Sequence, residues 1–333
     1  MCCISCLIRN DNSRHRRKPP CQVPPRGGFF CDEKYLPYAA LAIHTLVRNN
    51  PVRDFDICIT SLDALELPPA LEGHDVRLCQ IEVGDAFDGM PVNERFTVAA
   101  YLRIALPEAF EDEYARILYL DCDVLVVGEA LGEVFALDLG NSSVGAVMDI
   151  SKLKKPRRLT KDQKLTGMTG SYFNSGVLLL DVNAFVGEGV RDKCVLTAQN
   201  DPTALFYFDQ TLLNVVLQGR WAELHPAWNW QWTIVRPFFE LFVDTQIVHL
   251  VSKPKPWSDA SGVLPIRYRE TVRRFFARYY PDLPLTTASP ATRLEKKNVV
   301  IRLIKHITRS FTFVNGYNRH GGDIMKVVLP DRP

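Results

Sequence analysis

The stretch RILYLDCDVLVVGEA, residues 116–130, is an apolar run interrupted by two aspartates one residue apart. Side chains i and i+2 of a strand point to the same face, so Asp121 and Asp123 converge if the strand continues through them. Two carboxylates this close repel each other, and burial increases the cost. A divalent cation removes the repulsion, and an oxygen-rich site suits Mg²⁺ or Mn²⁺. The alternative is a solvated strand end whose aspartates cap nearby amides.

Helical and strand-like patterns alternate on both sides of this stretch. The alternation predicts an α/β fold with a mostly parallel central sheet flanked by helices on both faces. In such open sheets ligands bind at the carboxyl ends of strands, which is where Asp121 and Asp123 fall. Helices are expected at 36–50, 94–110, 208–219, 266–279 and 294–310, with a weak one at 61–71. Strands are expected at 55–60, 76–83, 115–127, 142–150 and 176–182 and from 245 onward, with a basic loop at 151–164.

The composition is that of an ordinary globular protein: 333 residues, 47% hydrophobic and 23% charged, enough for a core without disulfides. A formal net charge of +2 does not indicate an extended basic surface of the kind that binds nucleic acid. No stretch approaches the roughly 18 uncharged apolar residues of a membrane span, and the N-terminus lacks the features of a signal peptide. We therefore expect a cytoplasmic protein. The apolar settings of Cys58, Cys79 and Cys194 are typical of cysteines in a core.

The chain divides into three parts by composition. Residues 1–27 are polar and rich in proline, which predicts an irregular N-terminal tail. The alternating pattern occupies residues 28–262 and predicts a single α/β domain, and residues 263–333 predict a C-terminal helical extension. None of the three parts contains an internal repeat.

The last predicted helix, 294–310, has a basic amphipathic pattern. Such a helix can lie on an anionic membrane surface, which would make the protein peripheral on the inner face of the cytoplasmic membrane. It can equally pack on the core with a solvated basic face, and the sequence leaves both interpretations open. The apolar face comprises Val300, Leu303, Ile304 and Ile307, and the basic residues are Arg293, Lys296, Lys297, Arg302, Lys305 and Arg309.

Several blocks of this sequence, in their order along the chain, resemble glycosyltransferase family 8. They are CDEKYLPYAALAIHTL (31–46), RFTVAAYLRIALPEAF (95–110), ILYLDCDVLVV (117–127), YFNSGVLLLD (172–181), FDQTLLN (208–214) and VHLVSKPKPW (248–257). The family includes bacterial lipooligosaccharide and lipopolysaccharide galactosyl- and glucosyltransferases and glycogenin. The resemblance covers about residues 29–257 and implies a GT-A fold, Mn²⁺, and retaining transfer of glucose or galactose from a UDP-sugar. In a bacterium it implies a cell-surface glycan acceptor, such as the lipopolysaccharide core.

The resemblance implies that Asp121, Asp123 and His249 hold the metal, with Asp121 also near the ribose. A histidine ligand favours Mn²⁺ over Mg²⁺, although Mg²⁺ also suits the carboxylates. Taken alone, a histidine that ends an apolar strand is typical of a satisfied core residue. Lys255 matches the family lysine on the diphosphate, where a compact ammonium charge suits phosphate. Its alternative is a solvated surface lysine.

The other matching positions surround the donor. Tyr35 could stack on the base or pack at the edge of its helix. Arg103 lies in an otherwise apolar helix, where an arginine needs a partner. Asn174 precedes a strand, where its amide could reach a sugar hydroxyl or serve turn chemistry. The resemblance implies uracil and ribose contacts from Asp32, Lys34 and Tyr35, donor-sugar or diphosphate contacts from Arg103, Asp149 and Asn174, and a UDP-sugar contact from Cys122.

Asp209 and Gln210 open the helix predicted at 208–219. The resemblance implies that Asp209 and Asp149 bind sugar hydroxyls as part of the catalytic set, and that Gln210 lies beneath the anomeric carbon. Asp209 could instead be a simple N-cap. Retaining glycosidases use a carboxylate nucleophile, but the Gln210 amide is uncharged and a poor nucleophile. We therefore expect a front-face route, in which the acceptor hydroxyl attacks beside the departing diphosphate, and a covalent glycosyl-enzyme is the alternative.

Trp228, Trp230 and Trp232 could stack on the acceptor sugar or belong to the core. Three features depart from the family pattern: only the short GGFFCD precedes the first turn, Ser252 replaces a glycine, and Thr211 stands where many relatives carry an aspartate. We expect a metal-dependent retaining hexosyltransferase. Its rivals are a sugar-nucleotide hydrolase and a non-catalytic UDP-sugar-binding protein.

Overall fold

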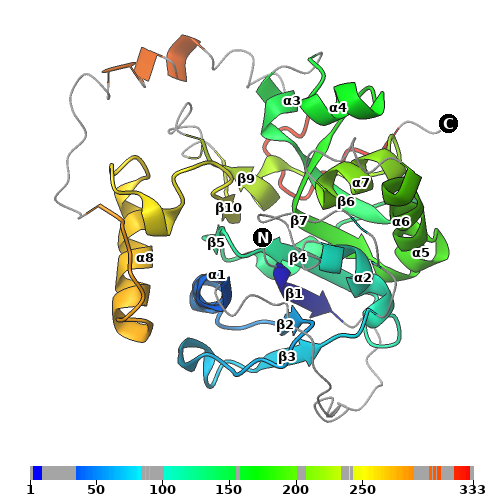
Figure 1. Cartoon of the computed structure of the whole chain (residues 1–333). Helices are drawn as coiled ribbons and strands as arrows, with labels where there is room; N and C mark the ends of the chain where they lie inside the picture. Colours follow the sequence, from blue (N-terminus) through cyan, green and yellow to red (C-terminus); the bar gives the residue numbers. More distant parts are fainter. Residues whose placement is uncertain are drawn as a thin grey trace.

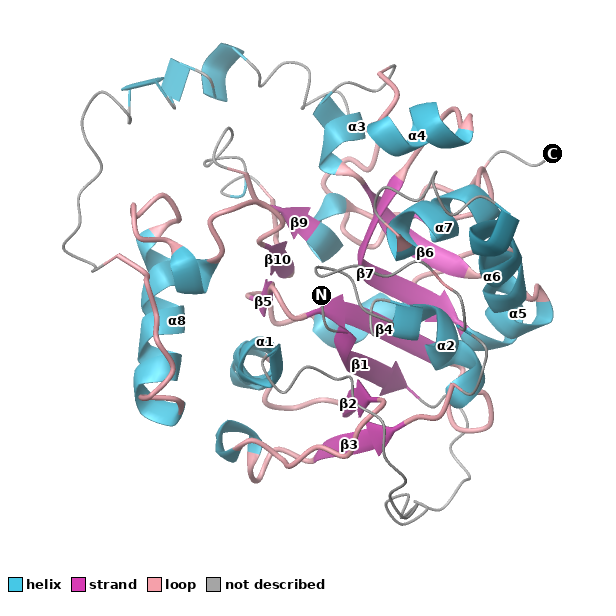
Figure 2. Ribbon diagram, viewed as in Figure 1, coloured by secondary structure: helices cyan, strands magenta, loops and turns pink. Residues whose placement is uncertain are grey.

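Figure 1 shows the computed structural model of the chain. It describes residues 3–9, 35–83, 87, 90, 101–154, 158–200, 208–233, 240, 243–288, 300–301, 303–304, 306–308 and 319–330. A seven-stranded central sheet lies beside a smaller three-stranded sheet. Helices cover both faces of the central sheet (Figure 2), as the alternating sequence pattern predicts.

The central sheet has the strand order β3-β2-β1-β4-β7-β6-β8. β1 is antiparallel to β2 and β4, and β7 is antiparallel to β4 and β6. The β2–β3 and β6–β8 pairs are parallel. Five strands therefore run in one direction and β1 and β7 oppose them. Four of the six neighbouring pairs are antiparallel, so the sheet is mixed where a mostly parallel one was predicted. The strands are β1 (Cys3–Arg9), β2 (Asp56–Ser61), β3 (Val76–Gln80), β4 (Arg116–Asp121), β6 (Val144–Met148), β7 (Phe173–Asp181) and β8 (Ala222–Glu223).

The smaller sheet has the order β5-β10-β9, with β5 (Val124–Val126), β10 (Ile247–His249) and β9 (Trp230–Gln231). Because β4 ends at Asp121 and β5 begins at Val124, the chain passes from one sheet to the other at the acidic pair. The strand predicted at 115–127 is thus two strands in two sheets. The two carboxylates converge at this crossing and do not belong to one continuous strand.

Helices lie on each side of the central sheet, and α3 and α4 lie beyond one end of it (Figure 2). α1 and α8 lie on one side and pack through aromatic rings: the ring centroids of Tyr38 and Phe276 are 5.6 Å apart, and those of His44 and Phe275 are 5.1 Å apart. α2, α5 and α6 lie on the other side. The helices are α1 (Leu36–Asn49), α2 (Leu102–Ala109), α3 (Ile150–Lys154), α4 (Lys161–Thr166), α5 (Val182–Gly187), α6 (Val190–Asn200), α7 (Asp209–Val216) and α8 (Ile266–Tyr279).

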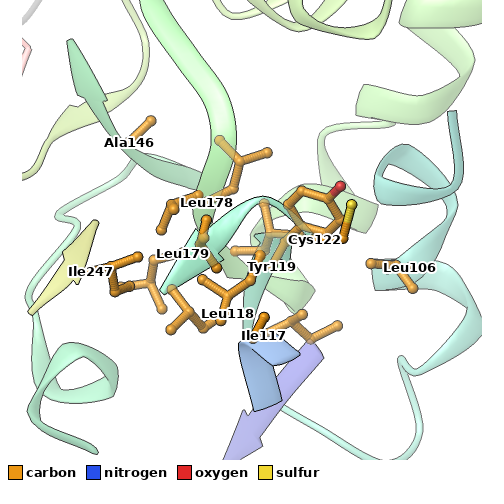
Figure 3. Close-up of a cluster of buried hydrophobic side chains, with 14 of the residues drawn as sticks. Leu106, Ile117, Leu118, Tyr119, Cys122, Ala146, Leu178, Leu179 and Ile247 are labelled. Carbon is orange, nitrogen blue, oxygen red and sulfur yellow. The ribbon is translucent and has the colours of Figure 1, made fainter. Parts of the chain in front are cut away.

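The core is built around β4 and β7 (Figure 3). Leu118 pairs with Leu179 and Tyr119 with Leu178, and all four side chains are fully buried. Continuous apolar runs are what strands covered on both faces require. Burying each leucine stabilises the fold by about 1.5–3 kcal/mol. These two strands therefore form a rigid base, and the residues at their ends carry the site described below.

Two predictions of local structure are wrong. The weak helix at 61–71 is absent from the described chain apart from a 3-10 turn at Pro69–Leu71, because two consecutive prolines remove backbone donors. The basic loop at 151–164 contains α3 and the start of α4. A reciprocal capping box between Thr160 and Gln163 starts α4, and its polar caps are easily mistaken for loop residues. The helices predicted at 36–50, 208–219 and 266–279 are confirmed as α1, α7 and α8.

The irregular tail predicted for residues 1–27 is wrong at residues 3–9. These form β1, which pairs with β2 on one side and β4 on the other. The facing edges of β2 and β4 need a strand between them to pair their backbone groups. The stretch CISCLIR fills that position, so part of the predicted tail belongs to the central sheet. The boundaries 28–262 and 263–333 stay predictions.

The C-terminal extension departs from a packed helix. Residues 300–308 are helical where described, and Val300, Leu303, Ile304 and Ile307 are about half exposed, at 47–55%. Figure 1 shows this segment, in orange, apart from the central sheet and from α8. Packing of this apolar face on the core is therefore wrong for these residues. Among the described helices, none has the length and apolar character needed to cross a bilayer.

Candidate functional site

Three potential metal ligands converge where the two sheets meet. Asp121, Asp123 and His249 each offer one ligand atom, and these atoms lie within 4.8 Å of one another. His249 Nε2 is 3.0 Å from Asp123 Oδ1 and 3.8 Å from Asp121 Oδ2. All three side chains are buried. The structure thus joins the aspartate pair to a histidine far away in the sequence, as the three predicted metal ligands require.

The smaller sheet positions His249. In the antiparallel β5–β10 pair, His249 lies opposite Val124, the residue after Asp123. The next backbone amide, of Leu250, donates to the Asp123 carbonyl at 3.0 Å. The register of this short pair therefore sets how closely the imidazole approaches the carboxylates.

Hydrogen bonds fix the tautomer of His249. Asn229 Nδ2 donates to Asn174 Oδ1 at 2.9 Å, so Asn229 presents its Oδ1 as the acceptor for His249 Nδ1 at 3.0 Å. Neutral His249 then carries its proton on Nδ1 and a lone pair on Nε2. Within the described part of the chain, neither Nε2 nor Asp123 Oδ1 has a hydrogen-bond partner. Two facing buried lone pairs repel each other, and a divalent cation bound to both removes the conflict, so these residues fit a metal site.

Gly176 of β7 is part of the site, although sequence reasoning did not single it out. A Cβ at this position would lie 2.1 Å from His249 Cε1 and 2.7 Å from Asp121 Oδ2. Only a glycine allows the backbone of β7 to approach the two ligands this closely. A glycine inside the apolar run YFNSGVLLLD was the available signal.

Lys255 contacts the site from the loop after β10. Its ammonium donates to Asp123 Oδ2 and, at 2.7 Å, to the Leu250 carbonyl. Burial raises the pKa of Asp123, but the Lys255 ammonium and, when it is protonated, the His249 imidazolium lower it below its ordinary value. Lys255 keeps 21% of its side chain exposed against 6% for Asp123. It is therefore a partly accessible cation beside the ligands and not a solvated surface lysine.

Arg103 of α2 links the acidic pair to α7. Its Nη2 donates to Asp121 Oδ1 at 3.0 Å, and its Nε lies 3.1 Å from Asp209 Oδ2. Nη1 donates to the Ser175 carbonyl at 2.7 Å, and the guanidinium lies 4.4 Å from the centre of the Tyr119 ring. The side chain is buried, so these contacts provide the partners that an arginine in an apolar helix needs.

Asp209 begins α7 but does not cap it. The N-cap residue is Phe208, while Asp209 Oδ2 accepts from Ser175 Oγ at 3.2 Å and pairs with Arg103. Burial raises the pKa of Asp209 to about 6, against the lowering effect of Arg103. The simple N-cap interpretation is therefore wrong, because the carboxylate is held inside the site.

Gln210 lies against a bulge in β7. The β6–β7 register passes from the Ala146–Leu178 pair directly to the Val147–Asn174 pair, which takes the residues between Asn174 and Leu178 out of the ladder. Gln210 Oε1 accepts from Asn174 Nδ2 at 3.2 Å and from the Ser175 amide at 3.1 Å. Asn174 Oδ1 also accepts from the Gly176 amide at 3.1 Å, so turn-type bonding accompanies its contact with Gln210.

Asn214 holds α7 against β7. Its Oδ1 accepts from the Phe173 amide at 2.8 Å, and its Nδ2 donates to the Phe173 carbonyl at 3.0 Å and to the Gln210 carbonyl at 2.9 Å. This pairing sets the register between the helix and the strand. A buried asparagine four residues after Gln210 was a signal that sequence reasoning did not use.

The remaining residues predicted to contact the UDP-sugar are Asp149, Tyr35, Cys122, Asp32 and Lys34. Asp149 follows β6 and is half-buried; its amide donates to the Tyr172 carbonyl, and its Oδ1 accepts from the Ser151 amide at 2.8 Å. The Tyr35 ring lies 5.9 Å from Tyr38 and packs partly on the core, in line with helix-edge packing. Cys122 belongs to the buried cluster in Figure 3, and burial raises the pKa of its thiol. Asp32 and Lys34 lie outside the described residues.

The three tryptophans belong to the core. Trp228, Trp230 and Trp232 are each at most 5% exposed. Trp228 Nε1 donates to the Ile324 carbonyl at 2.8 Å, which fastens the C-terminal residues to the domain. Stacking of an acceptor sugar on these rings is therefore wrong for this arrangement.

The fold and the site together define the class of protein to which this chain belongs. The structure resembles that of the galactosyltransferase LgtC in complex with donor and acceptor sugar analogues, with a TM-score of 0.59, 20% identity, and coverage of 77% of this chain and 95% of that one. It also resembles the apo structure of the bifunctional glycosyltransferase WbbM, with a TM-score of 0.56, 19% identity, and coverage of 74% and 48%. The protein has the GT-A fold of these glycosyltransferases.

The chain belongs to glycosyl transferase family 8, whose model matches residues 29–261. Among curated relatives, general stress protein A of Bacillus subtilis is 32% identical over 181 residues, which are 50% of this chain and 61% of that protein. The lipopolysaccharide 1,3-galactosyltransferase of Salmonella typhimurium is 23% identical, with 53% and 54% covered. The chain thus spans less than two thirds of these two relatives. A lipopolysaccharide 1,2-glucosyltransferase of Escherichia coli is 25% identical over 304 residues, or 86% of each chain.

Proposed function

We propose that the protein is a metal-dependent retaining hexosyltransferase that moves glucose or galactose from a UDP-sugar to a glycan hydroxyl. The observation that carries this proposal is the convergence of Asp121, Asp123 and His249, with the facing Nε2 and Oδ1 atoms left without hydrogen-bond partners. Membership of family 8 and the names of the relatives favour a lipopolysaccharide-type glycan as the acceptor.

The charges around the ligands suit a diphosphate only when a cation is present. With His249 neutral, the carboxylates of Asp121, Asp123 and Asp209 outnumber Arg103 and Lys255 by one negative charge. A bound divalent cation would reverse that balance to one positive charge, which attracts a diphosphate. When bound, Mn²⁺ or Mg²⁺ supplies a Lewis acid that neutralises the charge on the leaving diphosphate. The imidazole favours Mn²⁺.

In the proposed front-face route, the bond between the anomeric carbon and the diphosphate oxygen breaks, and its electron pair stays on the diphosphate. The acceptor hydroxyl oxygen forms the new bond to that carbon on the same face, and its proton passes to the departing diphosphate oxygen. Gln210 Oε1 would stabilise the positive charge on the sugar. Asp209 is engaged by Arg103 and Ser175, which disfavours it as a covalent nucleophile.

A donor panel tests this proposal. The protein is incubated with several UDP-sugars in Mn²⁺, Mg²⁺ or EDTA, with and without lipopolysaccharide-derived oligosaccharides, and the products are analysed by mass spectrometry and NMR. We expect a glycan product with the anomeric configuration of the donor, and none in EDTA. UDP release without a glycan product would indicate a hydrolase. Binding without turnover in every arm would indicate a UDP-sugar-binding protein, and full activity in EDTA would contradict the metal site.

A peripheral contact with an anionic membrane is the second part of the proposal. Its support is the half-exposed apolar face of Val300, Leu303, Ile304 and Ile307 within a basic sequence. The test is co-sedimentation with neutral vesicles and with vesicles containing phosphatidylglycerol, comparing the natural chain with a Leu303→Gln, Ile304→Gln, Ile307→Gln variant. Pelleting with anionic vesicles that is lost in the variant is expected. Equal pelleting of both chains would contradict the contact.

A further inference from the structure

We propose that Asp162 is a positioning residue for the transfer reaction and orients the amide of Gln210 through the hydroxyl of Tyr172. Asp162 lies in α4, in the segment that sequence reasoning treated as a basic loop. The inference rests on the proposed function, because it assigns to Gln210 a contact with the reacting sugar. Asp162 is not among the residues predicted to bind the metal, the UDP-sugar or the acceptor.

The contacts form a short chain from α4 to α7. Asp162 is fully buried, and its Oδ2 accepts from the Tyr172 hydroxyl and from Thr211 Oγ1, each at 2.5 Å. The Tyr172 oxygen in turn accepts from Gln210 Nε2 at 3.4 Å. On its other side, Gln210 Oε1 accepts from the Ser175 amide at 3.1 Å. Each link joins a different segment of the chain.

The direction of these hydrogen bonds decides which way the amide points. Burial raises the pKa of Tyr172 well above its ordinary range, so the phenol keeps its single proton. That proton goes to Asp162, which leaves the phenol oxygen as an acceptor for an N–H group. Gln210 must therefore turn its NH₂ group toward Tyr172 and its carbonyl oxygen toward Asn174 and Ser175.

The orientation matters for chemistry on a sugar that becomes positively charged. A carbonyl oxygen beside the anomeric carbon stabilises that charge, whereas an NH₂ group in the same position opposes it. Without the Asp162 carboxylate, the phenol proton is free to turn toward Gln210, which removes the acceptor for the NH₂ group. The amide is then held only on its carbonyl side, by Asn174 and Ser175, and its position is less constrained. Asp162 thus acts on the transition state without touching the substrate.

The helix that carries Asp162 is held firmly enough to transmit this orientation. Thr160 accepts from the Gln163 amide at 3.1 Å, and Gln163 Oε1 accepts from the Thr160 amide at 3.1 Å. Gln163 Nε2 donates to the Gly170 carbonyl at 3.1 Å. Thr166 Oγ1 donates to the Asp162 carbonyl at 2.8 Å. α4 is therefore tied both within itself and to the segment that leads to Tyr172.

A double-mutant cycle tests the inference. The variants are D162N, Y172F, the double variant, and Q210A. The matched control is E240Q, since Glu240 accepts from the buried hydroxyl of Tyr268 in α8 at 2.7 Å, in a similar carboxylate–phenol pair. For each variant, kcat and donor KM are measured with the active UDP-sugar and Mn²⁺, together with the thermal midpoint.

We expect D162N and Y172F each to lower kcat by about 10- to 100-fold, the range found for outer partners of site residues, with the donor KM unchanged. The kcat of the double variant should be no lower than that of the less active single variant, because both substitutions break the same chain of contacts. E240Q should keep kcat even where its thermal midpoint falls.

Wild-type kcat in D162N, or independent losses that multiply in the double variant, would overturn the inference. If D162N does not fold, Y172F alone still tests it, because phenylalanine keeps the ring and removes only the hydroxyl. Failure of wild-type transfer, or a Q210A variant with full activity, would instead count against the proposed function.

Discussion

Replacing Gly176 by alanine tests the metal centre with one added methyl group. The new Cβ would lie 2.1 Å from His249 Cε1, whereas ordinary contact begins near 3.4 Å, so the imidazole or the strand must move by about 1.3 Å. Asp121 Oδ2, at 2.7 Å, would be displaced as well. A misplacement of about 1 Å at a reacting centre costs about 100-fold in rate, or about 2.7 kcal/mol. We therefore expect kcat/KM of G176A to fall by about 100-fold.

The assay is UDP-sugar turnover over a range of Mn²⁺ concentrations, combined with the rise of the thermal midpoint on adding Mn²⁺. In G176A the Mn²⁺ concentration for half-maximal activity should increase and the thermal shift should shrink. G187A is the matched control, because a Cβ at Gly187 meets nothing within 4 Å. Wild-type turnover and wild-type Mn²⁺ dependence in folded G176A would refute the reasoning.

Three further outcomes follow from the same contacts. Substitution His249→Ala should abolish the stabilisation of the folded protein by Mn²⁺. In the wild type this stabilisation is about 2.7 kcal/mol when the Mn²⁺ concentration is 100 times the dissociation constant. A thermal shift in the variant equal to that of the wild type would contradict a ligand role. Substitution Lys255→Met should weaken UDP binding by about tenfold at constant Mn²⁺, through loss of one charge-assisted contact worth about 1.5 kcal/mol; unchanged affinity in calorimetry would count against a diphosphate contact. Because burial raises the pKa of Asp209 to about 6, the folded state binds this proton more tightly than the unfolded state, and the stability that it contributes is lost as pH rises through 6. The free energy of unfolding of the metal-free wild type, measured relative to D209N by urea titration, should therefore fall by up to about 3 kcal/mol between pH 4 and pH 7. A difference that does not change with pH would show that Asp209 titrates normally.

Local patterns in the sequence predicted many of the helices and strands. α1 and α8 follow from apolar stripes of helical period, and β4 and β7 from continuous apolar runs. The same reasoning missed α4, since its polar caps and basic residues resemble a loop. It also missed β1, because the strand between β2 and β4 is chosen by pairing across the sheet and has no local signature.

The site shows the same division. Asp121 and Asp123 could be named from their place at the end of an apolar strand, and His249, Lys255 and Arg103 from ordered motifs. The glycine at 176 was visible inside an apolar run, but the reason for it was not, because it depends on a Cβ clash with side chains from two other strands.

The sequence alone thus determined the α/β alternation, the acidic pair at a strand end and the family, because these depend on the order and period of residues along the chain. Only the tertiary structure decided the partners: that Asn229 orients His249, that Arg103 joins two carboxylates, and that Asp162 lies behind Gln210. Lys255 and Asp123, for example, are 132 residues apart. Such contacts depend on how two sheets and their helices pack, and packing is a property of the whole chain and not of any local stretch.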